Sequence, residues 1–119
     1  MVFLVTRKSQ VQAMLEKVAE LRGRAEDIEG EPGGPSREDA MRAELLHDEA
    51  DGLSWAITET RARIILEAGA LKAKAVAIAG ELAPARDDEL LAAEAEADSL
   101  LARARGMRWA LLTLDGGAA

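Results

Sequence analysis

Apolar residues recur at alternating intervals of three and four along most of the chain, and this heptad spacing limits the possible folds most strongly. In the first quarter, one series recurs every seventh residue and a second follows three positions later: Leu4, Val11, Val18 and Ala25, then Met14, Leu21 and Ile28. Positions spaced in this way share one face of an α-helix. The pattern predicts a first helix over residues 6–29, which ends at Gly30.

Gly and Pro residues crowd together only in the stretch IEGEPGGPSRED, at residues 28–39. Within it, Ser36 is placed to cap the free backbone N–H groups of a second helix, and acidic residues follow in the first turn. Because helical patterns lie on both sides, this stretch is interpreted as the bend of a helical hairpin rather than a linker between two domains.

No further proline occurs until Pro84, so the sequence predicts one long second helix over residues 36–82. A short turn around Pro84 then leads into a third helix over 86–114, and residues 116–119 form a flexible tail. Residues 1–115 are therefore expected to form a single helical domain.

The apolar stripe of the long helix changes register midway. Its first part follows one heptad series and its second part another: Ala43, Leu46, Ala50, Leu53 and Ile57, then Ile64, Ala68, Leu71, Ala75, Ile78 and Leu82. The change equals a four-residue stutter near Arg61, which we interpret as local unwinding of a coiled coil. The expected fold is all-α: two short helices packed antiparallel on one long central helix in a coiled-coil-like bundle.

Each short helix pairs with one half of the long helix, and a two-helix hairpin of this kind buries too little apolar surface to be stable alone. Further helices must therefore pack on the apolar faces of each hairpin. The second half of the long helix also carries another face of small and apolar residues: Ala62, Leu66, Gly69, Ala73, Val76 and Gly80. Small residues at this spacing allow helices to approach closely. We therefore expect a homodimer or higher oligomer; the alternative is a compact monomeric three-helix bundle.

Charge and composition exclude several classes of function. The net charge of −7 argues against binding to nucleic acid, and the absence of cysteine excludes disulfides and thiolate metal sites. The apolar start MVFLV is too short for a membrane span and lacks a basic region before it, so we expect a cytoplasmic protein with no membrane partner. The excess of Arg over Lys and the abundant Ala favour a bacterial or phage source.

Equal-rise pairing of the helices brings five arginines and two tryptophans to the middle of the long helix: Arg61, Arg63, Arg103, Arg105, Arg108, Trp55 and Trp109. We call this set the arginine waist. It is a candidate docking site for a protein partner, or for the acidic shoulder of another subunit, residues 30–52, where seven acids face two bases for a net charge of −5. The alternative is that these arginines only cover an apolar seam.

The single histidine suggests a metal site as a second hypothesis. Glu44 and His47 show the Glu-x-x-His spacing that ferritin-like di-iron bundles use, and Asp48 and Asp51 lie a turn away. In the register set by the apolar stripe, however, only His47 borders the core. A solvated acidic face is therefore the favoured interpretation.

A third hypothesis is a magnesium-dependent nucleotide pyrophosphohydrolase, because two pairs of helical carboxylates, Glu26 with Glu29 and Asp48 with Asp51, could hold the ion. No phosphate-binding glycine loop or nucleophile with a partner base supports an enzyme. The leading prediction is a non-catalytic assembly or adaptor protein, without a cofactor, that acts through self-association and contacts with an unidentified protein partner.

Overall fold

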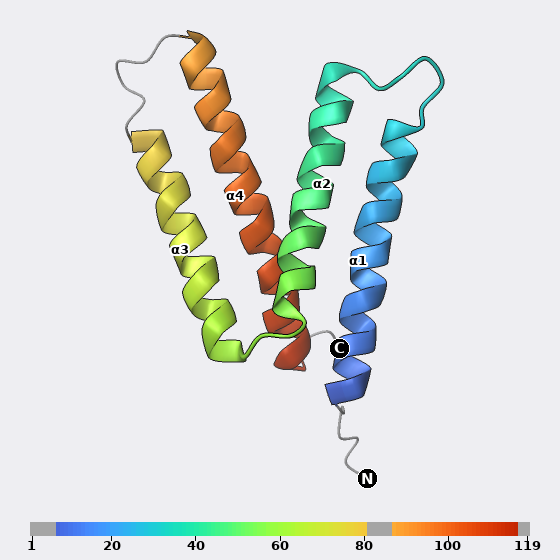
Figure 1. Cartoon of the computed structure of the whole chain (residues 1–119), viewed down its shortest axis with the longest axis vertical. Coiled ribbons are helices and arrows are strands. Elements are labelled where there is room, and N and C mark those ends of the chain that lie inside the picture. Colours follow the sequence, from blue (N-terminus) through green and yellow to red (C-terminus); the bar gives the residue numbers. More distant parts are fainter. Residues whose placement is uncertain (1–6, 81–86, 117–119) are drawn as a thin grey trace.

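The computed structural model describes residues 7–80 and 87–116, and within them it contains four α-helices and no strand. The helices are α1 (Arg7–Glu29), α2 (Arg37–Ala56), α3 (Arg61–Gly80) and α4 (Asp87–Leu114). Figure 1 shows them as two helical hairpins, α1–α2 and α3–α4, that meet at one end and diverge towards the other. The predicted all-α helical bundle is confirmed, whereas the predicted number of helices is not.

The long central helix predicted over 36–82 is wrong, because residues 57–60 break it into α2 and α3. The N–H of Ile57 donates to the carbonyl of Ser54 and the N–H of Glu59 to that of Ala56, which closes a tight turn. Thr60 precedes α3 and caps it, because its Oγ1 accepts a hydrogen bond of 3.3 Å from the N–H of Arg63. The register change at Arg61 thus marks the start of a new helix and not a stutter. Leu82 and Pro84 lie outside the described residues.

The bend between α1 and α2 forms at the predicted Gly/Pro stretch. Gly33 and Gly34 both have φ of 84°, a left-handed conformation that residues with a side chain rarely adopt. Ser36 is the N-cap of α2, and its Oγ accepts a hydrogen bond of 3.1 Å from the N–H of Asp39. The hairpin interpretation of this stretch is therefore right.

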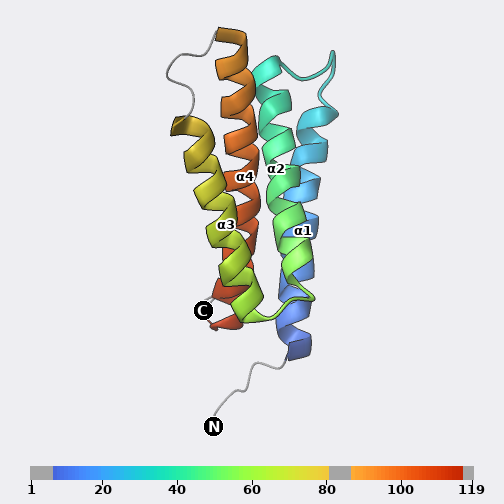
Figure 2. The same cartoon turned by 60° about the vertical axis from the view of Figure 1, so that its left-hand side comes forward.

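The two hairpins pack through α2 and α4, which run in the same direction because each is antiparallel to α3 (Figures 1 and 2). Pairing of α1 with α2 and of α3 with α4 is antiparallel, as expected from the short connections. The predicted arrangement of three antiparallel helices did not include the parallel contact. The radius of gyration is 16.6 Å, above the roughly 13 Å of a compact domain of this length.

Gly52 of α2 and Gly106 of α4 allow the two helices to cross in backbone contact. A Cβ on Gly106 would overlap the carbonyl oxygen of Glu49 and lie 2.7 Å from the backbone nitrogen of Leu53. A Cβ on Gly52 would overlap the carbonyl oxygen of Arg103 in the same way. Both residues are buried, as are the small residues one helical turn away: Ala56, Ala102 and Ala110. Two stripes of small residues therefore set the distance between the hairpins.

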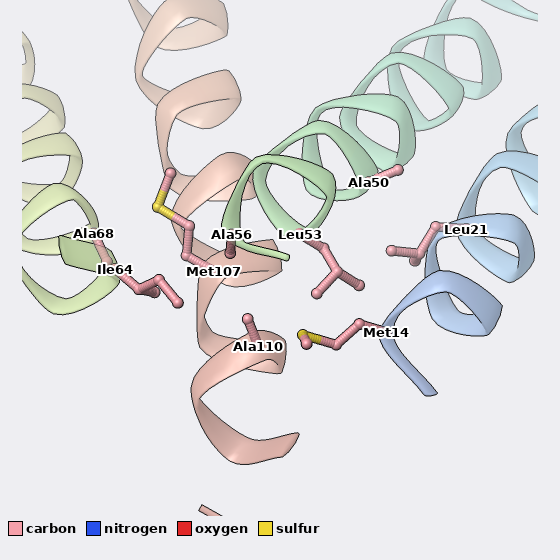
Figure 3. Close-up of a cluster of buried hydrophobic side chains, with 9 residues drawn as sticks. All are labelled: Met14, Leu21, Ala50, Leu53, Ala56, Ile64, Ala68, Met107 and Ala110. Carbon is pink, nitrogen blue, oxygen red and sulfur yellow. The ribbon is translucent and has the colours of Figure 1, made fainter. Parts of the chain in front are cut away.

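All four helices contribute to one hydrophobic core around this crossing, shown in Figure 3. Its buried members are Met14, Leu21, Ala50, Leu53, Ala56, Ile64, Ala68, Met107 and Ala110. Most of them occupy the predicted heptad positions, so the heptad pattern identified the core faces correctly. Of the two tryptophans predicted to meet at the middle of the long helix, Trp55 is partly buried against this core and Trp109 is 39% exposed.

Candidate functional site

The arginine waist does not form one free cluster, because most of its arginines contact carboxylates of the same chain. Arg61 donates to Asp115 at 2.8 Å, and this hydrogen bond lowers the pKa of the Asp115 carboxyl below its ordinary value. Three more arginines form longer and weaker ion pairs: Arg63 with Glu59 at 3.8 Å, Arg103 with Asp48 at 4.0 Å and Arg105 with Glu49 at 3.7 Å. Only Arg108 makes no ion pair with another described residue.

Three members of the arginine waist do come together, in a cleft of about 360 Å³ where α2, α3 and α4 meet. Trp55, Arg63 and Arg103 line this cleft above Met107 and Leu71. Asp51 and Glu67 line it as well, so its two positive charges are matched by two negative charges. This balance gives the cleft no strong preference for a charged ligand.

Trp109 lies elsewhere, between α4 and α1. The Nζ of Lys17 sits 4.4 Å from the centroid of its ring, within cation–π range. On the same side, Gln10 donates hydrogen bonds to the carbonyls of Thr113 and Leu114 at the end of α4. These contacts attach α1 to the end of α4, which indicates a structural role for Trp109.

Three of the four residues of the metal hypothesis, His47, Asp48 and Asp51, contact partners on other helices. His47 contacts Glu29 through Nε2 at 2.8 Å and Arg22 through Nδ1 at 3.3 Å, and a neutral imidazole protonated at Nε2 satisfies both contacts. Arg22 also donates to Asp51 at 2.7 Å.

Asp48 instead accepts a hydrogen bond of 2.7 Å from Ser99 on α4, and Glu44 is exposed. Within residues 7–80 and 87–116, no three carboxylate or imidazole side chains are grouped closely enough to hold a metal ion. Of the carboxylates considered for magnesium, Glu29 and Asp51 are engaged by His47 and Arg22. His47 and Asp51 thus form contacts between α1 and α2, and Asp48 forms one between α2 and α4.

Among the described residues, the two most exposed large hydrophobic side chains, Leu66 and Val76, lie on the outer face of α3. We define it by the six residues that the sequence grouped as a second face: Ala62, Leu66, Gly69, Ala73, Val76 and Gly80. All six are exposed, with Leu66 at 72% and Val76 at 71% of their full accessible surface. A Cβ on Gly69 or Gly80 would meet no atom within 4 Å, so the packing of this chain does not require glycine there.

A groove of about 440 Å³ lies beside this face, between α3 and α4. Its apolar walls are Ala75, Val76 and Ala79 of α3 with Ala97 and Leu101 of α4, and Glu94 and Asp98 stand at its edge. The heptad pattern of the third helix includes Ala97, but sequence reasoning did not single out Glu94, Asp98 or Leu101. The signal that could have found them is charge segregation, because residues 87–101 contain six acids and no base.

Comparison with known proteins gives no family assignment: no protein-family model matches the chain, and searches of curated proteins and of solved structures returned no match. Among the described helices, none combines the length and apolar character needed to cross a lipid bilayer.

Proposed function

We propose that this protein is a non-catalytic helical assembly element that self-associates through the outer face of α3. The observation that carries the proposal is the exposure of Leu66 and Val76 on a face about 30 Å long. Large exposed apolar patches on soluble proteins mark interaction sites.

The chain's own packing supports this interpretation of the small residues. At the α2–α4 crossing, Gly52, Gly106 and neighbouring alanines bring two helices into backbone contact. The outer face of α3 repeats the same combination of glycine and alanine at helical spacing, with open space above Gly69 and Gly80. A second helix packed there would bury Leu66 and Val76 and complete the cover of α3.

Self-association through α3 leaves the α1–α2 hairpin free for a different protein. The acidic shoulder, residues 30–52, keeps Glu31, Glu38 and Glu44 exposed, and these side chains suit a partner with basic groups. The arginine waist is a weaker candidate for contact with a partner, since four of its five arginines are already paired within the chain.

Replacing Leu66 and Val76 together with glutamate should weaken self-association at least about a hundredfold. Each buried aliphatic side chain contributes about 1.5 kcal/mol or more to association, and every 1.4 kcal/mol corresponds to a factor of ten. Sedimentation equilibrium measures the dissociation constant. Leu15→Glu is the matched control, because Leu15 is an exposed leucine on α1. Equal dissociation constants for the two variants would contradict the proposal.

A further inference from the structure

The charges around the α3–α4 groove are separated between its two helices. α3 carries Arg61, Arg63, Lys72 and Lys74 against the single acid Glu67, for a net charge of +3. Residues 87–101 of α4 carry only acids. The groove edge is therefore acidic on the α4 side, next to a basic helix.

The charged side chains nearest the groove have no partner within the described part of the chain. Glu94 and Asp98 are exposed at the groove edge and form no ion pair with another described residue. Lys72 of α3 is exposed and equally unpaired among the described residues. Lys72 lies one helical turn before Val76, which itself lines the groove. Basic and acidic groups thus flank the same apolar surface without neutralising one another.

We propose that the groove receives α3 of a second copy, so that two α3–α4 hairpins form a four-helix bundle in which Lys72 of each copy pairs with Glu94 and Asp98 of the other. This inference rests on the proposed self-association and specifies its geometry. Both copies offer a basic helix and an acidic groove edge, so in a twofold dimer the contact between them occurs twice. The aliphatic side chains of the outer face of α3 then fill a groove whose walls are mostly alanine.

The reciprocal geometry makes charge exchange between two variants the sharpest test. One variant carries Lys72→Glu, and the other carries Glu94→Lys with Asp98→Lys. In a homodimer of either variant, both copies of the contact bring like charges together, and self-association should weaken at least about tenfold. In the mixed dimer, one contact is reversed and the other is native, so both are attractive.

The expected result is that each variant alone is mainly monomeric at a concentration where the unmodified chain is dimeric, while an equal mixture recovers the dimer. Light scattering on the separate and mixed samples provides the measurement. Recovery on mixing also demonstrates that both variants fold. Lys74→Glu is the matched control, because Lys74 lies about 200° around α3 from Lys72 and should leave the dimer intact.

Two results would overturn this geometry while leaving self-association through α3 in place. The first is that both charge variants dimerise as tightly as the unmodified chain, although Leu66→Glu with Val76→Glu abolishes the dimer. The second is that the variants weaken the dimer but their mixture does not restore it. A monomeric unmodified chain would overturn the proposed function and this inference together.

Discussion

Replacing Gly106 with alanine is expected to lower the free energy of unfolding by about 3 kcal/mol, near the upper end for overpacking substitutions. The added Cβ would overlap backbone atoms of Glu49 and Leu53, and a backbone cannot move aside as a flexible side chain can. The two hairpins must therefore separate at their crossing, and the core around it loses contacts. Denaturant unfolding measures the change, at one fixed protein concentration because the proposed self-association would also contribute to stability.

Gly23→Ala is the control for this substitution. Gly23 lies inside α1, and a Cβ there would meet no atom within 4 Å. Alanine is the better helix former, so this variant should be more stable than the unmodified chain by about 1 kcal/mol. If both alanine variants gained stability, the backbone contact between α2 and α4 would be refuted.

Leu53→Ala is expected to cost about 3 kcal/mol of unfolding free energy, within the range for large-to-small changes in a core. Leu53 is fully buried in the cluster that receives side chains from all four helices (Figure 3). Removing its side chain leaves a cavity where the hairpins meet, and the close crossing of α2 and α4 limits collapse into that cavity.

Leu15→Ala provides the comparison for Leu53→Ala, because Leu15 is 49% exposed on α1. A change at such a site should stay within about 0.5 kcal/mol. The difference between the two leucine variants, measured from denaturant midpoints, tests whether the core lies at the junction of the hairpins. Similar losses would place the core elsewhere.

Local signals in the sequence were enough to place most helix ends. Gly30 follows the last residue of α1, where the low helix propensity of glycine favours an end. The Ser36 side chain caps α2 through a local hydrogen bond. Both signals depend on few neighbours. The heptad spacing likewise identified Met14, Leu21, Leu53 and Ile64 as core residues. Heptad periodicity depends only on which face of a helix is buried.

The break between α2 and α3 was harder to predict because residues 57–60 contain neither glycine nor proline. The available signals were the shift of the apolar stripe at Arg61 and three β-branched residues, Ile57, Thr58 and Thr60, which favour helix less than alanine or leucine does. A stutter and a chain reversal both shift the stripe. Only the packing of α3 against α4 distinguishes them.

The α2–α4 contact and the ion pairs of the arginine waist depend on tertiary structure that periodicity does not encode. Gly52 and Gly106 are each tolerated as isolated helix glycines, and nothing local shows that they face one another. Ala102, Gly106 and Ala110 form a stripe of small residues at four-residue spacing on α4, comparable to the second face of α3. The exposure of the outer face of α3 was the part of the candidate site that could be predicted, since one helix carries it entirely.

The central claim, that the protein assembles through α3, is tested most directly by the molar mass of the unmodified chain in solution. Light scattering across a series of concentrations should approach twice the chain mass of 12.7 kDa, and the mass should fall when Leu66 and Val76 are replaced with glutamate. A mass of 12.7 kDa at every concentration would contradict the claim.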